Sequence, residues 1–501
     1  TPPVRGLVPS FRDIDENRHS FRLGAEHTVG STRLDLGMRY DLSENTQSLY
    51  THRHPGEPLF DRKATTTDSV ETDLFNIHAS SVTRFSEKLQ LGAGYGFTTL
   101  DTDVSGSRIF GDQYDALFDP IFQRRRYRDA GFLGLNGGSQ LHQSVLNLNL
   151  FYRPWKHVAL IPALRAERTS TESSNGFAST SVDNSLTTRQ DAFWLDSERQ
   201  YQEISERLEL RYTGWTDWSI YGRGEWTQGG GDLDEFLIGV NPQARMTDDD
   251  RRTQKYTAGA NWYPLSRLNF GFQYYHKIHN LGYDHDLDTT PNQSPSNNQL
   301  PAFVSDRAFR TDDLNLRMTW RPISKITLLS RYDYQNSRLD SRAERIGSNQ
   351  ESDMEAHILS ETVTWQPLSR LYLQGGFSYT YDVTSTSANS ILVSGVPLTP
   401  ESQNNYWNVH GTIGLAATEK VDLDLSYYHY RADNYLDNSA VTLPFGAAFT
   451  EHVVRFGIQY RWKPEILWKS SYSYFHSEDQ TSGGNNNFDA HGIYTSIQYL
   501  F

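Results

Sequence analysis

Residues 365–381 read Trp365-Gln-Pro-Leu-Ser-Arg-Leu-Tyr-Leu-Gln-Gly-Gly-Phe-Ser-Tyr-Thr-Tyr381. After Arg370, leucine and aromatic side chains largely alternate with polar and small ones. A period of two is typical of a β-strand with one apolar and one polar face. Because proline has no N–H to donate to a ladder, Pro367 predicts that a strand ends and a turn begins just before residue 371.

The same turn motif recurs along the chain. Close copies are Trp262-Tyr-Pro-Leu-Ser-Arg-Leu268 and Trp320-Arg-Pro-Ile-Ser-Lys-Ile326, and looser copies are Tyr152-Arg-Pro-Trp-Lys-His-Val158 and Trp462-Lys-Pro-Glu-Ile466. An aromatic residue two positions before a turn proline is well placed for the headgroup level of a membrane. The motif therefore predicts tight turns at one interface, with an aromatic girdle of Tyr152, Trp262, Trp320, Trp365 and Trp462.

Charged residues fix the orientation of the predicted strands. Asp422 and Asp424 alternate with Val421, Leu423 and Leu425. A charge on the lipid face of a membrane barrel is destabilising, so the face that carries the aspartates is predicted to line the lumen. Applied to the other strands, the same reasoning predicts these lumen-facing residues: Asp422, Asp424, Arg455, Gln459, Arg461, Gln273 and Gln374.

Composition excludes several classes of protein. Mean hydropathy is −0.65, and no stretch reaches the roughly 18 apolar residues that a spanning helix needs. Cysteine is absent, which excludes disulfides, thiolate metal sites and covalently attached haem. The formal net charge of −14 argues against nucleic acid as a partner. Without a Gly-x-Ser-x-Gly elbow or a phosphate-binding loop, we predict no enzyme activity and no cofactor.

These observations predict an all-β fold: a transmembrane, antiparallel, up-and-down β-barrel of about 19–20 strands, with short periplasmic turns and long extracellular loops. Strands of roughly 10 to 14 residues are expected, and their number is expected to be even. Residues 18–501 would form the barrel. Residues 1–17 would be an N-terminal segment, either a periplasmic tail or an extra strand over Val4 to Ile14; otherwise that strand lies upstream of Thr1.

Three segments carry candidate site residues. A loop predicted from about Thr102 to Gly138 contains Arg124, Arg125, Arg126 and Arg128, which could fold inward as a lumen constriction or lie on a solvated surface loop. Residues 275–288 gather histidines and aspartates where a strand is predicted to meet a loop, but their spacing matches no closed metal site. The same holds for residues 51–54. The glycine runs 229–231 and 483–484 are predicted to be flexible outer-loop connections.

The C-terminal residues alternate in the same way and end on an aromatic side chain, with Ile497, Tyr499 and Phe501 on one face. This pattern closely resembles the last strand of Gram-negative outer-membrane proteins. The resemblance implies recognition by the barrel-assembly machinery, a place in the bacterial outer membrane, and contact with outer-membrane lipid and lipopolysaccharide. The chain begins Thr1-Pro2-Pro3 without a signal sequence, as expected after signal-peptide removal or trimming.

Three functions stay open, because fold alone does not fix function. The first is a passive, porin-like pore for small polar solutes. The second is a sheath around a multihaem cytochrome, because the strand series with proline turns is similar to the decahaem-associated outer-membrane proteins of porin–cytochrome conduits. Those barrels have more strands and often carry an N-terminal Cys-x-x-Cys that this chain lacks. The third is an export barrel or a scaffold that displays its loops to surface partners.

Overall fold

The computed structural model describes residues 10–51, 64–110, 131–182, 188–289, 304–343, 350–387, 392–393, 396–397, 401–436, 446–481, 483–484 and 486–499. These residues form one antiparallel sheet of nineteen strands, and a small separate hairpin of β15 (Leu392–Val393) and β16 (Val396–Pro397). The described part of the chain contains no helix long and apolar enough to cross a membrane. The predicted all-β class and up-and-down antiparallel barrel architecture are confirmed.

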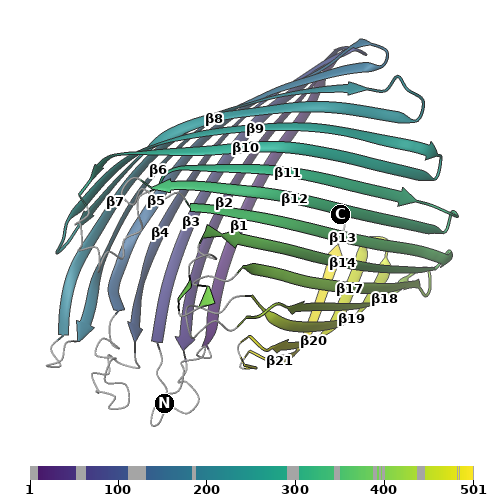
Figure 1. Ribbon diagram of the computed structural model, residues 1–501. Helices are drawn as coiled ribbons and strands as arrows, with labels where there is room; N and C mark the ends of the chain where they lie inside the picture. Colours follow the sequence, from purple (N-terminus) through teal and green to yellow (C-terminus); the bar gives the residue numbers. More distant parts are fainter. Residues whose placement is uncertain are drawn as a thin grey trace.

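Each strand of the large sheet pairs with the next one along the chain, and the sheet curls round on itself (Figure 1). The strands are β1 (Ser10–Val29), β2 (Thr32–Thr51), β3 (Ala64–Ser86), β4 (Leu89–Phe110), β5 (Gly131–Trp155), β6 (Val158–Val182), β7 (Thr188–Tyr212), β8 (Trp218–Ile238), β9 (Gln243–Leu265), β10 (Leu268–Asp288), β11 (Val304–Trp320), β12 (Ile326–Ala343), β13 (Gln350–Leu368), β14 (Leu371–Thr386), β17 (Ser402–Ala416), β18 (Val421–Asp433), β19 (Ala448–Lys463), β20 (Ile466–Asp479) and β21 (Phe488–Tyr499).

Tight connections join alternate pairs of strands at one end of the sheet. They include all five proline-containing motifs and three connections without proline, near residues 85–88, 214–217 and 418–420. Gly30, at the β1–β2 turn, and Asp217, at the β7–β8 turn, have φ values of 60° and 63°, in the left-handed region that tight turns use. The predicted turns are therefore confirmed.

The strands are longer than predicted, with 12 to 25 residues. Residues 102–110 and 131–138, which were assigned to a long loop, belong to β4 and β5, where Asp103 pairs with Gly138. A strand needs only about 9–11 residues to cross a membrane. Beyond that length both faces of the sheet meet water, so apolar alternation stops while backbone pairing continues. Residues 124–128 lie outside the described residues.

Residues 229–231 were also assigned wrongly to a loop, since they lie inside β8 and pair with both β7 and β9. A Cβ atom added at Gly231 would overlap the carbonyl oxygen of Gln200 on β7. Glycine is therefore needed for close approach of two backbones, a role that the run Gly-Gly-Gly does not reveal without the fold.

Burial in this sheet is the reverse of burial in a soluble protein. Among the described residues, the buried hydrophobic ones are only Ala356 and Ala432, whereas Asp41, Glu209 and Asp333 are all buried. Large apolar side chains are exposed on the opposite face instead. We call the face that carries Asp41, Glu209 and Asp333 the polar face, and the other one the apolar face. Such an arrangement is stable only where the apolar face meets lipid.

Aromatic residues of the predicted girdle sit next to the tight turns. Tyr152, Trp320, Trp365 and Trp462 are exposed. Trp262 is more covered, because it stacks between Trp218 and Phe270 with ring centroids 5.5 Å apart in each case. Their place at the membrane interface stays a prediction.

The edges of the sheet are β1 and β21, and the described residues contain no ladder between them. β1 starts at Ser10, so residues 10–14 continue the first strand, and the extra strand predicted over Val4 to Ile14 is wrong for those residues. The predicted division after residue 17 also falls inside β1. Both edge strands run toward the tight-turn end. Since backbone groups in hydrocarbon must be paired, closure requires either a parallel β1–β21 ladder or an oppositely directed strand between them.

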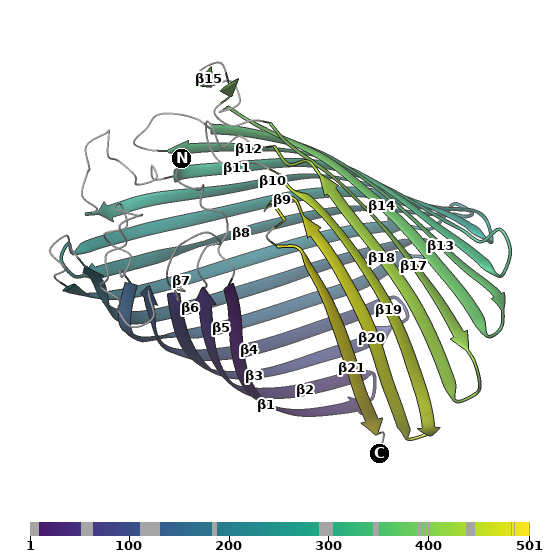
Figure 2. The same cartoon turned by 90° about the horizontal axis from the view of Figure 1, so that it is seen from below.

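Strand length varies systematically around the sheet. β5, β6 and β7 have 25 residues each, whereas β18 to β21 have 12 to 16. Figure 2 shows the long strands running across the back of the molecule and the short yellow strands at its near edge. Because the tight turns share one end, the extra length lies at the other end, where the longer connections are. The end of β21 keeps its predicted alternation, with Ile497 and Tyr499 exposed, and Phe501 lies outside the described residues.

Candidate functional site

The residues predicted to face the lumen share the polar face of the sheet. On β18 and β19, Asp422 pairs in register with Gln459, and Arg461 contacts the Asp422 carboxylate at 3.5 Å. Asp424 lies over Gly457, where an added Cβ would overlap its carboxylate. Arg455, which is opposite Ser426, completes this group.

The two predicted glutamines lie on the same face in other strands. Gln273 on β10 accepts a hydrogen bond of 2.8 Å from the Tyr221 hydroxyl on β8. Gln374 on β14 is opposite Thr412 of β17 and Thr364 of β13. The polar face is thus continuous over strands that lie far apart in the sequence.

A charge pair recurs on the polar face near the tight turns, and the alternation of the strands alone did not predict it. An arginine and a carboxylate two residues apart on the same strand contact each other on β2, β6, β7, β8 and β12. The contacts are 2.6 Å for Arg165–Glu167, Arg211–Glu209 and Arg331–Asp333, and 3.2 Å for Arg223–Glu225, and the fifth pair is Arg39–Asp41. In the sequence, these pairs are visible as Arg-x-Asp, Arg-x-Glu or Glu-x-Arg.

Asp41 is the centre of the most connected of these pairs. Its carboxylate accepts hydrogen bonds from the Arg39 guanidinium, from Arg18 at 3.0 Å and from the Ser20 hydroxyl at 2.5 Å. Arg18 and Ser20 come from β1, so this cluster fastens the edge strand to its neighbour. Hydrogen bonds to an ionised group are the stronger kind, and a buried carboxylate with three donors is well satisfied.

Cross-strand amides support two other carboxylates. Asn315 on β11 donates to Asp333 at 2.8 Å, and Gln143 on β5 donates to Glu167 at 2.6 Å. Each of these acids therefore contacts an arginine of its own strand and an amide of the adjacent strand.

The two partners of a pair differ in exposure. The carboxylate side chains of Asp41, Glu209 and Asp333 are 6%, 11% and 11% exposed, whereas their arginines Arg39, Arg211 and Arg331 are 38%, 50% and 56% exposed. Arg165 and Glu167 follow the same pattern, with 49% and 18%. Only the β8 pair is more even, with 25% for Arg223 and 33% for Glu225. In the other four pairs, the guanidinium group therefore projects away from the polar face of the sheet, and the carboxylate lies closer to the backbone.

All five pairs lie within ten residues of the tight-turn end of their strands. That distance matches the part of each strand that crosses a membrane of normal thickness. The pairs consequently lie at the depth where the apolar face is lined by leucine and aromatic side chains, for example Leu36 on β2 and Phe272 on β10.

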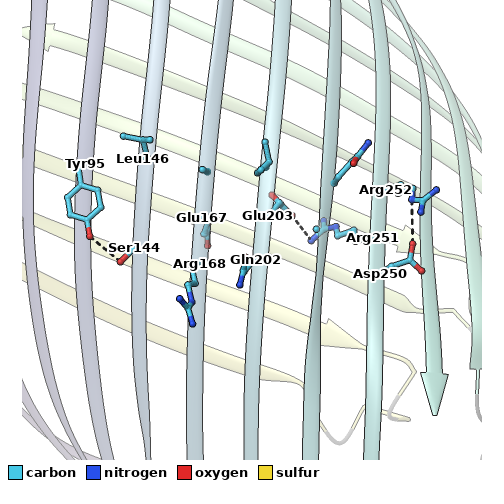
Figure 3. A pocket seen from close by; sticks show the side chains of 14 residues that line it. Tyr95, Ser144, Leu146, Glu167, Arg168, Gln202, Glu203, Asp250, Arg251 and Arg252 are labelled. Atoms are coloured by element: carbon cyan, nitrogen blue, oxygen red, sulfur yellow. Dashed lines mark hydrogen bonds and ion pairs between the residues drawn. The ribbon is translucent and has the colours of Figure 1, made fainter. Parts of the chain in front are cut away.

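A second feature lies on the apolar face of β4 to β9, at the level where apolar side chains give way to polar ones. It is a groove of about 590 Å³, with Tyr95 and Leu146 at one end, Arg252 at the other end and Arg168 between them (Figure 3). The Tyr95 hydroxyl lies 3.2 Å from Ser144, and Arg252 contacts Asp250 at 3.6 Å. Arg168 forms no ion pair with any described residue.

The histidines of segment 275–288 do not converge on one point. The segment lies entirely within β10, where His276 faces Asp312 at 2.9 Å and His279 faces Thr253 at 2.7 Å, on opposite sides of the sheet. In the part of the chain that the structure describes, no three histidine or carboxylate groups are arranged to hold a metal ion. His52 and His54, the histidines of the other candidate segment, lie outside the described residues.

No family model matches the sequence, and no curated protein matches it. Solved structures do. The siderophore receptor PiuA from Acinetobacter baumannii has 8% identity and a TM-score of 0.52, and the match covers 98% of this chain and 80% of the receptor. The ferric yersiniabactin uptake receptor FyuA from Yersinia pestis has 9% identity and a TM-score of 0.53, with 99% and 80% covered.

These similar proteins are bacterial outer-membrane β-barrel receptors. At this level of identity the likeness is one of fold and not of ligand. Together with the exposed apolar face, it places the chain in the bacterial outer membrane, as the terminal strand predicted. It lends nothing to the predicted resemblance to cytochrome sheaths.

Proposed function

We propose that the chain forms a passive conduit for small polar solutes across the outer membrane, with the polar face lining the lumen. The observation that carries this proposal is the band of arginine–carboxylate pairs at membrane depth on the face opposite to the lipid-facing side chains. At that depth a charged side chain is costly on the lipid face, and charged groups as a rule face a water-filled interior or pair with one another. By name, one of the two similar proteins is a siderophore receptor and the other is a ferric yersiniabactin uptake receptor, and a transport role fits the same fold.

Purified protein added to a planar lipid bilayer should give stepwise, ohmic conductance. A wet lumen with fixed charges conducts salt at any applied voltage, without a ligand or an energy source. The measurement is single-channel current against voltage in KCl, with detergent alone and heat-denatured protein as controls. A membrane that stays silent while intact protein is inserted would contradict the passive role and favour a gated receptor or a display scaffold.

The absorption spectrum of the purified protein separates the conduit from the cytochrome sheath. Since the chain has no cysteine, any covalently bound haem must come from a partner. The conduit predicts no haem absorption after mild detergent extraction. A red complex with a multihaem protein, and no conductance until that protein is removed, would support the sheath instead.

We also propose that the groove beside Arg168 holds the phosphorylated headgroup of an outer-leaflet lipid such as lipopolysaccharide. Arg168 is the eleventh residue of β6, at the level where the apolar side chains stop. Its unpaired guanidinium lies above Leu146 and Ile204, which would contact acyl chains. A cation at this level attracts lipid phosphate.

The substitution Arg168→Ala should lower the amount of lipopolysaccharide that remains on the purified protein about fivefold, the factor that corresponds to roughly 1 kcal/mol for one basic residue at an anionic surface. Native mass spectrometry would count bound lipid per protein. Arg165→Ala removes an arginine from the polar face of the same strand, and it should leave bound lipid unchanged. Equal loss in both variants would refute a specific contact.

A further inference from the structure

We infer that the lumen prefers anions, although the chain as a whole carries a formal net charge of −14. This inference rests on the proposed conduit function and adds the class of solute to it. Small inorganic anions and carboxylated or phosphorylated solutes are the substrates that such a lumen would favour.

The first argument is the asymmetry of the arginine–carboxylate pairs. In four of the five, the carboxylate is the less exposed partner and the guanidinium faces the space in front of the sheet. A pair oriented in this way is a dipole with its positive end toward the lumen. A mobile ion approaches the positive end more closely, so a formally neutral pair still attracts anions.

Unpaired cations on the same face strengthen this effect. Arg207, Arg317 and Arg455 form no ion pair with any residue that the structure describes. All three lie on the polar face within the membrane-spanning length, because their register partners Glu225, Gly271 and Ser426 lie on that face. Because a guanidinium stays protonated at any ordinary pH, these charges persist under all recording conditions.

Many of the acidic residues lie beyond the membrane-spanning part of the sheet. Asp101, Glu172, Glu198 and Asp234 belong to one continuous register row across β4 to β8, on the continuation of the apolar face beyond the membrane-spanning part. That row faces away from the lumen. At physiological salt, charges more than about 8 Å away are largely screened, so the outer acids have little influence on an ion inside the lumen.

The test is the reversal potential of the conducting protein in a tenfold KCl gradient. Its sign should show chloride permeating more readily than potassium. Arg455→Gln and Arg331→Gln should each lower the chloride-to-potassium permeability ratio by at least about twofold, because each removes a charge that concentrates anions locally. Arg455 has no acidic partner to orphan, so its variant keeps the test valid if Arg331→Gln fails to fold.

Arg338→Gln is the matched control. Arg338 also lies on β12 and pairs with an acid two residues later, with Arg338 Nε and Asp340 Oδ1 3.2 Å apart, but on the other face of the strand from Arg331. Its reversal potential should equal that of the unaltered protein. A conducting protein that prefers potassium, or a ratio that changes equally in Arg455→Gln and Arg338→Gln, would overturn the inference alone. Absence of any conductance would overturn the proposed function itself.

Discussion

Replacing Phe272 with arginine should destabilise the membrane-inserted protein by about 2–4 kcal/mol, the cost of a basic residue on the lipid face near the midplane of a barrel. Phe272 is the fifth residue of β10 from the tight-turn end and lies on the apolar face, 40% exposed. The substituted guanidinium would have no partner in hydrocarbon. The measurement is the free energy of unfolding in urea for protein folded into lipid vesicles, followed by tryptophan fluorescence.

Gln273→Arg is the control for this substitution, because the neighbouring side chain points to the opposite face. There the new arginine would share the wet, charged side of the sheet with Tyr221 and lose only the hydrogen bond that this tyrosine donates. A change of less than about 1 kcal/mol is expected. If both variants lost the same stability, the assignment of the two faces would be wrong.

Replacing Gly231 with valine should cost about 1–3 kcal/mol, the usual penalty for forcing extra atoms into a packed contact. The added Cβ would overlap the Gln200 carbonyl oxygen and crowd the Tyr201 backbone on β7. The β7–β8 ladder would have to shift locally. The same urea titration measures the loss, and increased protease cleavage between β7 and β8 would accompany it.

Gly222→Val tests whether this penalty is specific. Gly222 lies nine residues earlier on the same strand, and a Cβ added there meets no atom within 4 Å. Because valine is favoured over glycine in strands, this variant should be neutral or slightly stabilising. A penalty at Gly222 as large as that at Gly231 would mean that Gly231 is needed for backbone flexibility and not for the close approach of β7.

The fold could be predicted wherever a strand separates two solvents. Residues 371–381 alternate because one face meets lipid and the other meets water, and the structure confirms the strand there. The same rule failed for residues 102–110, where both faces meet water and the sequence loses its period. It failed again at residues 229–231, because a glycine run looks the same whether it bends a loop or lets two strands approach.

The candidate site was predicted less completely than the fold. Asp422 and Arg461 were each assigned to the lumen from alternation, yet their contact depends on the register between β18 and β19. The pairs of the Arg331–Asp333 kind are local and could have been read from the sequence, since residues two apart share a face of a strand. The cluster around Asp41 could not, because Arg18 reaches it only through the β1–β2 ladder.

The unequal strand lengths give the outer opening of the proposed conduit a direction. At ordinary strand rise and tilt, the residues of β5 to β7 beyond the membrane-spanning length rise roughly 35 Å above the lipid surface, whereas β21 barely clears it. The rim is therefore oblique, high behind β5 to β7 and low over β18 to β21. A solute would therefore enter over the short strands, close to the lipid headgroups, because the long strands block access from the opposite side.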